Sequence, residues 1–558
     1  MRYLELVELF EALSKTTKRL EKTKLIAVFI KKIRIEEIDD TMCLLTASVF
    51  PPYDKRKIGV SDRLILKAIN KSSGIKVKDI EKLWSKIGDL GDVGEKLLKE
   101  KLQKTLGAEV LTTNKVLTNL RKLAELEGEG TVDKKINLIA ELLANSKPNE
   151  AKFILRIILG ELRVGIAEGV IRDAFAQAYN VEIKDIKKGM DLALDYSEIV
   201  KLAKQGSFKS VKIKVGRPLK VMLAILAADI DEGFEALGKP MQLEFKLDGF
   251  RVTIHKLGNN IKLFTRRLED VSKQFPDVID VVKKNTKGDN YVIDAEVVAY
   301  SPETKKYLPF QTISQRIKRK YDILELAKKF PVELDVFDVL YYEGESYLDT
   351  PLKERRKLLT KIIKEKPGSI ILTKCLITDD LGKAKEFYHE ALSKGLEGVM
   401  MKNLNSPYKP GRYVEGWMKL KPILEPLDLV IVSAEYGEGK RASWLTSYTI
   451  ACSSKEGLKI VGKVSTGVKE KDSEVTYESM TKILKPLIIS QEGKLVKLKP
   501  KIVIEVGYEE IQVSQTYDSG FALRFPKFMR LRTFEKTIKD INTLEDVKRI
   551  YEKQKGKK

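Results

Sequence analysis

The stretch EFKLDGFR spans residues 244–251, and its side chains alternate between polar and apolar at the start. Successive strand residues point to opposite faces, so Glu244 and Lys246 should share one face while their apolar neighbours pack against a core. Asp-Gly is a strong signal for a tight turn, which predicts a hairpin whose second strand carries Arg251. Lys246 is therefore either a solvated charge beside a hairpin or a nucleophile that faces a site.

Five later segments continue the same alternation: IKLFTRR, YVIDAEVVAY, VELDVFDVLYY, GLEGVMMK and WMKLK. Phe337 lies on the polar face of the third segment, where an aromatic ring can stack on a base. Taken one at a time, each charged residue is explained simply by a strand face that is exposed to solvent. Together they predict one polar surface formed by Lys246, Arg251, Arg266, Glu296, Glu397, Lys402, Lys419 and Lys421.

Length and charge limit the class of protein. A chain of 558 residues is longer than one hydrophobic core usually supports, which predicts several domains, with three as the preferred interpretation. The formal net charge of +23 favours a polyanionic partner such as nucleic acid, although a solvated lysine-rich surface would give the same value. A charged content of 33% with many Lys and Ile residues resembles proteins from hot environments.

Scarce cysteine and histidine exclude several chemistries. The 3 cysteines lie far apart and cannot form a disulfide framework or a four-thiolate zinc site. With 2 histidines, Ser-His-Asp, Cys-His and multi-His metal sites are nearly excluded, so catalysis must use Lys, Arg and carboxylates. The start MRYLELVELFEAL is typical of an amphipathic helix rather than a signal peptide, and no apolar run is long enough to span a membrane.

Three regions with different periodicity follow one another. Residues 1–215 show helical spacing and predict an all-helical domain. Residues 216–421 alternate short strands with helices, which predicts an α+β region. Residues 422–558 are dominated by strands and predict a small barrel of the oligonucleotide-binding kind.

Two glycine-bearing turns carry arginines. ELRVGIAEG (161–169) contains Arg163, and KVGRPLKVM (214–222) contains Arg217. Backbone N–H groups near helix starts, together with an arginine, suit phosphate binding. Ordinary turns between helices have the same composition, so both interpretations stay open.

The ordered motifs resemble those of ATP-dependent DNA ligases of the archaeal and eukaryotic replicative type. They are KLDGFR (246–251), TRRLED (265–270), VIDAEVVAY (292–300), LDVFDVLY (334–341), LEGVMMK (396–402), GWMKLK (416–421) and SGFALRFPKFMRLR (519–532). Further similar segments, from RLEKT (19–23) to EVGYEEIQ (505–512), extend the resemblance over nearly the whole chain. The resemblance implies a helical DNA-binding domain at 1–215, a nucleotidyltransferase adenylation domain at 216–421 and an OB-fold domain at 422–558.

The resemblance also implies roles for single residues. Lys246 is similar to the lysine that carries AMP, Glu244 to the residue that reads the adenine amino group, and Phe337 to the aromatic that stacks on adenine. The implied nucleotide contacts are Glu244, Lys246, Arg251, Arg266, Glu296, Phe337, Arg412, Lys419 and Lys421. Glu296 and Glu397 match carboxylates near a divalent metal, Mg²⁺ or Mn²⁺, and Arg266 also matches a contact near the 5′-phosphate of a nick.

The last motif departs from the family's pattern. Arg532 is followed by TFEK, with one extra residue and Glu in place of Asp, so Lys536 is a doubtful pyrophosphate contact. Arg524 and Arg530 are the predicted pyrophosphate contacts instead. Lys527 stands where Arg is usual. A guanidinium that can bind a phosphate through two N–H groups is therefore replaced by a single ammonium charge.

The chemistry explains why these residue types are needed. A free lysine has a pKa of about 10.4 and is almost wholly protonated at neutral pH, so nearby cations and partial burial are expected to lower the pKa of Lys246. The implied reaction has three steps: Lys246 takes AMP from ATP, AMP passes to the 5′-phosphate at a nick, and the 3′-hydroxyl displaces AMP. Positioning and charge neutralisation carry such phosphoryl transfer, which suits a site without histidine.

Other enzyme classes fit less well. An NAD-dependent ligase shares the lysine motif, but that family carries a four-cysteine zinc site. A capping guanylyltransferase or an RNA ligase would not explain a helical region that resembles a ligase DNA-binding domain. The intact Lys246, Asp248, Glu296 and Lys419 disfavour a non-catalytic scaffold with a relict nucleotide pocket.

The expected partner is nicked double-stranded DNA, bound largely through phosphates, in replication, repair and recombination. Use of ADP or NAD in place of ATP stays open. A sliding clamp is a further candidate partner, because QKTLGAEV (103–110) stands where some archaeal relatives carry a clamp-binding loop, although it lacks the aromatic pair. The expected state is an intracellular, nucleoid-associated monomer with no membrane attachment.

Overall fold

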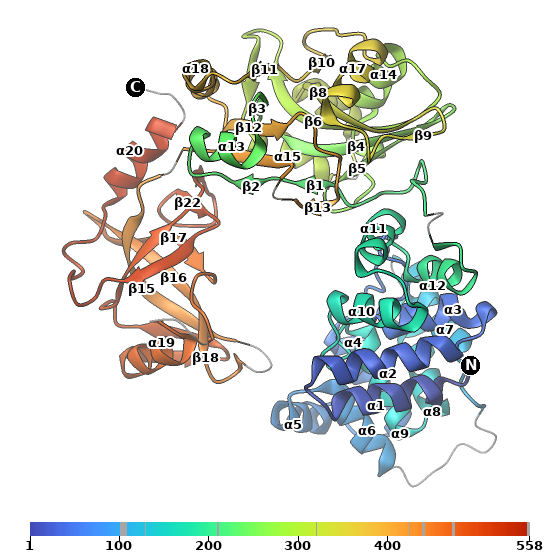
Figure 1. Cartoon of the computed structure of the whole chain (residues 1–558). Coiled ribbons are helices and arrows are strands. Elements are labelled where there is room, and N and C mark those ends of the chain that lie inside the picture. Colours follow the sequence, from blue (N-terminus) through green and yellow to red (C-terminus); the bar gives the residue numbers. More distant parts are fainter. Residues whose placement is uncertain are drawn as a thin grey trace.

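The structure is a computed structural model of the chain, and it describes residues 1–100, 109–128, 130–208, 211–319, 321–413, 415–422, 424–437, 441–470 and 475–554. Three bodies follow one another: one of helices, one of mixed sheets and helices, and one rich in strands (Figure 1). This order confirms the predicted fold class. Most of the segment 103–110, the candidate clamp-binding loop, lies outside the described residues. None of the helices in the described ranges combines the length and the apolar character needed to cross a bilayer.

The N-terminal body is helical, and helical spacing predicted its core. Leu142, Leu143, Phe153 and Ile154, which recur at helical spacing, are buried, and Leu138 of the same series is partly buried. The helices are α1 (Tyr3–Ser14), α2 (Arg19–Lys32), α3 (Ile38–Leu45), α4 (Asp62–Ser73), α5 (Val77–Ile87), α6 (Leu90–Lys99), α7 (Thr113–Glu125), α8 (Val132–Asn145), α9 (Pro148–Ile158), α10 (Glu168–Tyr179), α11 (Ile183–Ala193) and α12 (Tyr196–Lys204).

The middle body contains two larger sheets, which together carry most of the predicted polar surface. The first has the strand order β10 (Ile370–Leu372), β8 (Val332–Tyr342), β6 (Asn290–Ser301), β4 (Phe250–Leu257) and β5 (Asn260–Thr265), with β7 (Lys306–Leu308) beside β6 and β9 (Glu345–Ser346) beside β8. The second has the order β11 (Cys375–Thr378), β3 (Met241–Lys246), β12 (Gly398–Asn403), β14 (Trp417–Leu420) and β2 (Ile225–Leu226). A short pair joins β1 (Met222–Leu223) to β13 (Gly411–Arg412).

Helices and apolar clusters fix these sheets in place. The helices are α13 (Ile230–Leu237), α14 (Pro276–Asn285), α15 (Phe310–Lys318), α16 (Ile323–Lys329), α17 (Leu352–Ile362) and α18 (Leu381–Ser393). One apolar cluster belongs to the first sheet and another to the second. A third cluster joins Val292 and Leu340 of the first sheet to Trp417 of the second, so the inner faces of the two sheets share a core.

The predicted hairpin at Asp248-Gly249 is wrong. β3 pairs with β11 and β12 of the second sheet, whereas β4 pairs with β5 and β6 of the first. The chain therefore changes sheet at this turn instead of folding back on the same one. The predicted polar surface accordingly comes from two sheets, not from the continuous face of one.

The C-terminal body is rich in strands, as predicted. Its sheet has the order β17 (Gly457–Val464), β16 (Leu445–Ser454), β15 (Leu427–Tyr436), β19 (Leu495–Leu498) and β18 (Ile488–Glu492). β15 pairs with β19 near one end and with β20 (Val503–Gly507) near the other, and β20 also pairs with β23 (Lys527–Leu531). Added to these are the pair β21 (Glu510–Val513) and β22 (Phe521–Arg524) and the helices α19 (Tyr477–Leu484) and α20 (Leu544–Gln554).

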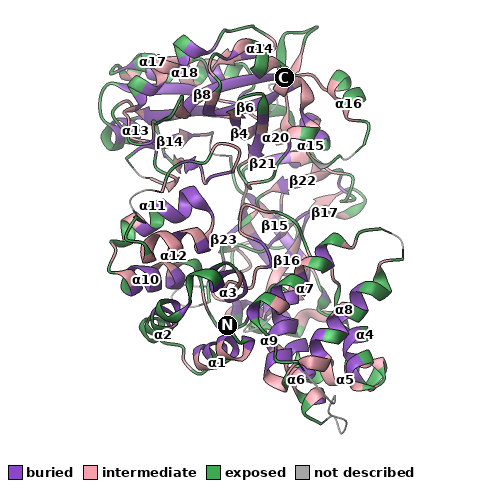
Figure 2. Ribbon diagram, turned by 90° about the vertical axis from the view of Figure 1, so that its right-hand side faces the viewer, coloured by how far each residue is buried: buried purple, intermediate pink, exposed green. Residues whose placement is uncertain are grey.

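Ion pairs connect the neighbouring bodies. Lys188 of α11 lies 2.8 Å from Asp349 in the middle body. Lys421, just after β14, lies 3.3 Å from Glu509 in the C-terminal body. Each body has its own buried interior, seen as purple segments in Figure 2, with exposed residues around it.

Candidate active site

Lys246 is the last residue of β3, at the point where the chain leaves the second sheet for the first. Its ammonium lies 2.6 Å from the Glu397 carboxylate, and the Lys421 ammonium lies 2.7 Å from the same carboxylate oxygen. Glu397 directly precedes β12, and its N–H donates to the Lys246 carbonyl at 3.0 Å, which fixes the two residues side by side. The three side chains are 20–22% exposed, so a ligand can reach them.

The groups around Glu397 carry a net positive charge. Burial raises the pKa of Glu397, but Lys246 and Lys421 outweigh burial and hold that pKa well below the ordinary carboxyl range. Burial, together with Lys421 and Lys246, lowers the pKa of Lys419 on β14. Three lysines around one carboxylate leave an excess of positive charge, which suits phosphate oxygens.

A second, more buried group lies farther back along β3. Glu244 is 2% exposed, and Lys402 lies 2.5 Å from one oxygen of its carboxylate. Gln242 donates to the other oxygen at 2.6 Å. The Lys402 ammonium also lies 4.7 Å from the Phe337 ring centroid and 4.4 Å from that of Trp417. Phe337 occupies a bulge of β8 where the pairing with β6 shifts register, and its side chain is half-buried.

Arg251 lies in a closed polar group on the inner face of the first sheet. Its Nε donates to Asp294 Oδ1 at 2.9 Å and its Nη2 to Asp294 Oδ2 at 2.5 Å. Nη2 also donates to the Tyr408 hydroxyl at 2.9 Å, and Nη1 donates to the Met222 carbonyl at 2.6 Å. The neighbouring Asp294 raises the pKa of Arg251 despite burial, so the guanidinium stays charged.

Glu296 is aligned between Arg251 on β4 and Asp335 on β8. Burial raises the pKa of Glu296 to about 8, although Lys246 and Arg251 pull it down. Glu397 adds to the rise, because a second negative charge disfavours ionisation. The unliganded site therefore holds a carboxyl that is mostly protonated near neutral pH.

Gly249 allows the turn between the two sheets to approach β6 closely. A Cβ at this position would lie 2.4 Å from the Val297 carbonyl oxygen and 2.9 Å from Glu296 Cγ. Asp248 accepts from the Phe310 N–H at 3.1 Å, which ties the turn to the start of α15. The Asp-Gly pair thus places Lys246 and Arg251 opposite Glu296.

Comparison with known proteins agrees with this geometry over the whole chain. Residues 2–176 match the DNA ligase N terminus, residues 221–421 the ATP dependent DNA ligase domain, and residues 441–534 the ATP dependent DNA ligase C terminal region. A DNA ligase of Nanoarchaeum equitans is 48% identical, with 100% of this chain and 99% of that protein covered. A DNA ligase of Thermococcus onnurineus is 40% identical, with 99% and 98% covered.

The chain belongs to the ATP-dependent DNA ligase family.

A solved structure agrees at the level of fold. The protein named Pmar-Lig_Pre has a TM-score of 0.59 and 19% identity, with 94% of this chain and 99% of that chain covered. The resemblance recognised from the sequence motifs is therefore confirmed. As a member of this family, the chain is an enzyme that uses ATP to seal nicks in DNA.

Other predicted site residues of the ligase have no described contact with the Lys246–Glu397 group. Arg266 is exposed in the turn after β5. Arg412 belongs to β13, and its side chain lies outside the described residues. Arg524 lies 3.1 Å from Glu510, and Arg530 lies 3.0 Å from Glu505, both within the C-terminal body.

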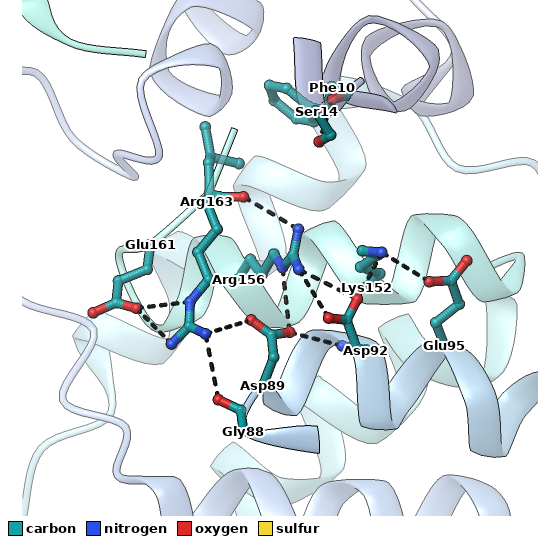
Figure 3. A network of polar contacts seen from close by, with 11 residues as sticks. Phe10, Ser14, Gly88, Asp89, Asp92, Glu95, Lys152, Arg156, Glu161 and Arg163 are labelled. Atoms are coloured by element: carbon teal, nitrogen blue, oxygen red, sulfur yellow. Dashed lines mark hydrogen bonds and ion pairs between the residues drawn. The ribbon is translucent and has the colours of Figure 1, made fainter. Parts of the chain in front are cut away.

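The predicted DNA-binding arginines of the ligase are also paired with carboxylates. Arg163 lies 3.0 Å from Asp89 and 3.0 Å from Glu161, and Figure 3 shows its guanidinium pointing toward both. Its side chain remains 44% exposed. Arg217 is only 15% exposed and lies 2.7 Å from Glu198, so it is held within the protein.

Sequence reasoning missed Tyr408 and gave Lys402 no role. The Tyr408 hydroxyl donates to Asp294 at 2.7 Å and accepts from the Met222 N–H at 3.1 Å. Tyr408 follows β12 in an irregular segment, where neither alternation nor helical spacing indicates which way a side chain points. Lys402 was placed correctly on the polar surface, but its partner Glu244 could be identified only from the pairing of β3 with β12.

Proposed function

We propose that Lys246 is the residue of this ligase that carries AMP between ATP and DNA. The observation that supports this most directly is the contact of Lys246 with Glu397, with Lys421 on the same carboxylate and Lys419 close by. In the first step the Lys246 nitrogen attacks the α-phosphate of ATP. A nitrogen–phosphorus bond forms, the bond to pyrophosphate breaks and the amine loses a proton.

The same pocket offers separate places for the parts of the nucleotide. Glu244 and Phe337 form the base end, where the carboxylate accepts from the adenine amino group and the ring stacks on the purine. Lys419 and Lys421 neutralise the α-phosphate oxygens beside Lys246. Arg251 contributes to the ribose or phosphate end, and Arg266 and Arg412 complete that end once the ligand is bound.

Glu296 and Glu397 are the residues that would hold a divalent cation, Mg²⁺ or alternatively Mn²⁺. Among the described residues no group of three or more His, Cys, Asp and Glu side chains is arranged to hold a metal. Two carboxyls nevertheless fit Mg²⁺, which usually takes one or two carboxylates and completes its shell with water and substrate phosphates. The raised pKa of Glu296 supports the site, because its ionised form lacks sufficient compensation in the unliganded protein. A bound cation would neutralise phosphate charge there.

The later steps need nicked double-stranded DNA across the same pocket. Arg163, Arg217 and Arg266 are the proposed DNA contacts, and Arg524 and Arg530 the proposed pyrophosphate contacts. Arg217 would have to leave Asp195 and Glu198, which hold it within the protein, to contact DNA. On binding, Arg163, Arg524 and Arg530 would each exchange a carboxylate partner for a phosphate. Their positive charge would then be paired both before and after the ligand binds. Lys536 is paired in the same way, with Asp428 at 2.5 Å, and we assign it no pyrophosphate contact because of the altered spacing of the last motif.

The wider setting follows from the reaction. We propose helical DNA-binding, adenylation and OB-fold domains at 1–215, 216–421 and 422–558, and a monomer that acts on intracellular, nucleoid-associated DNA in replication, repair and recombination. A sliding clamp is a further proposed partner.

A labelling experiment tests the assignment of Lys246. Incubation with α-labelled ATP and Mg²⁺, followed by a denaturing gel, should leave label on the wild type and none on Lys246→Ala. Lys262→Ala, which removes a lysine of β5 outside the Glu397 group, should label like the wild type. Label that persists on Lys246→Ala would refute the assignment.

A further inference from the structure

The segment 211–222, which we call the strap, connects the helical body to the middle body (Figure 1). Charged pairs fasten it to the helical body. Arg217 lies 2.9 Å from Asp195, and its guanidinium stacks 3.8 Å above the Tyr53 ring centroid. The Lys220 N–H donates to the Asp191 carbonyl at 3.0 Å. Arg217 and Lys220 therefore move together with the helices.

The residues on either side of Arg217 and Lys220 are fastened to the middle body by hydrogen bonds to their backbone. The Gly216 N–H donates to His255 Nδ1 at 3.3 Å, and the Val221 carbonyl accepts from the Gly411 N–H at 3.0 Å. Met222 is 0% exposed, and both of its backbone polar groups have side-chain partners: its N–H donates to Tyr408, and its carbonyl accepts from Arg251. Met222 also packs against Trp417 in the apolar cluster that includes Phe337. The strap thus ends at the back of the nucleotide pocket.

Tyr408 is the centre of this attachment, and its hydroxyl is fully used. A tyrosine hydroxyl offers one donor and has limited room for acceptors. Here it donates to Asp294 and accepts from both Met222 and Arg251. Removing this oxygen would leave the buried Met222 N–H without its partner.

Arg251 has little donor capacity left. A guanidinium has five N–H groups. Two are used by Asp294, one by Tyr408 and one by the Met222 carbonyl. One N–H of Nη1 is therefore available to a ligand. A nucleotide oxygen that accepts from both N–H groups of Nη1 must displace the Met222 carbonyl. The bonds from Arg251 to Asp294 are harder to displace, because opposite charge strengthens them.

We propose that Tyr408 is a positioning residue that joins Arg251 to the strap, and that loading of the pocket with AMP loosens the strap through Arg251. The inference rests on the proposed contact of Arg251 with the nucleotide. In the unliganded protein the Arg251–Tyr408–Met222 group holds the strap against the pocket. In the loaded protein Arg251 turns its Nη1 toward the ligand, the Met222 carbonyl loses its partner, and the helical body gains freedom to close on DNA. Nucleotide state and DNA engagement are thereby connected.

Hydrogen exchange on the full-length protein tests this connection. The wild type is compared before and after incubation with ATP and Mg²⁺, and intact mass shows whether AMP is attached. We expect amides in peptides covering 211–222 to exchange about tenfold faster after loading, the effect of losing a typical buried hydrogen bond. Peptides covering β16 and β17 should not change. Absence of AMP would contradict the proposed function, whereas attached AMP with unchanged strap exchange would overturn the present inference alone.

Two variants separate Tyr408 from a general effect on folding. Tyr408→Phe keeps the ring but removes the hydroxyl that accepts from the Met222 N–H, so strap exchange should already be about tenfold faster than in the wild type without nucleotide. Tyr413→Phe is the matched control, because the Tyr413 hydroxyl bonds only to Glu415 among the described residues, at 3.0 Å, and should leave the loading response intact. Strap exchange in Tyr408→Phe that equals that of the wild type without nucleotide would overturn the proposal. If Tyr408→Phe does not fold, the comparison of the wild type before and after loading with AMP still tests the proposal.

Discussion

Replacement of Glu296 by Gln should change how the stability of the protein depends on pH. Glu296 is aligned with Arg251 and Asp335 on the inner face of the first sheet. Burial raises the pKa of this carboxyl from 4.5 to about 8, against the opposing effects of Lys246 and Arg251. Gln has nearly the same shape as protonated Glu and cannot ionise. The two proteins should therefore be similar in acid and differ in base.

The sign follows from comparing the folded and unfolded states. In the unfolded chain Glu296 loses its proton near its ordinary pKa, and in the folded protein it keeps the proton until about pH 8. Folding is therefore favoured below the unfolded pKa, and this contribution is lost as pH rises through the folded pKa. At about 1.36 kcal/mol per pKa unit, the rise from 4.5 to about 8 sets an upper limit of about 5 kcal/mol. Because the side chain is only half-buried, we expect about 2 kcal/mol.

Thermal unfolding without divalent cations measures this difference. A loss of about 2 kcal/mol corresponds to about 4–8 °C in a domain of this size. The Tm of Glu296→Gln should match that of the wild type near pH 5 and exceed it by that amount near pH 9. Titrating groups that do not interact with Glu296 are shared and cancel in the comparison. Mg²⁺ added near pH 9 should narrow the gap, because a cation beside ionised Glu296 stabilises only the wild type. A gap that is independent of pH, or of opposite sign, would refute the reasoning.

Three further changes should have separable effects. Arg355→Met leaves the fully buried Asp338 without the partner that lies 2.7 Å away, so the free energy of unfolding, measured by chemical denaturation, should fall by about 3–5 kcal/mol. The double variant Arg355→Met with Asp338→Leu should recover most of this loss. A double variant that loses as much stability as Arg355→Met alone would contradict the pairing. Gly249→Ala would place a Cβ 2.4 Å from the Val297 carbonyl oxygen, so attachment of AMP should slow by more than about tenfold through displacement of the turn. Arg163→Gln should weaken binding to nicked DNA and reduce the slope of log affinity against log salt by about 0.9, as expected for one lost phosphate contact; an unchanged slope would argue against that contact.

Alternation along single strands predicted much of the site. Lys246 and Glu244 of β3 pair with Glu397 and with Lys402 of β12, and Arg251 of β4 pairs with Asp294 of β6. Phe337 was recognised because an aromatic residue stood in a polar position, and the structure places it 4.7 Å from the Lys402 ammonium. These predictions succeeded because the face of a strand residue depends only on local backbone geometry.

The errors arose where the outcome depended on which strands pair. Asp-Gly favours a tight turn whether the next strand returns beside the first or enters another sheet. Which of these happens depends on the strands that each one pairs with, and those strands come much later in the chain. β3 takes β12 as a neighbour, and β4 takes β6. The close contact of Gly249 with Val297 reveals why this turn needs glycine: the chain passes directly over β6 as it changes sheet. The same change of sheet places the lysine of this short motif in the second sheet and its arginine in the first, whereas a hairpin would have put both in one sheet.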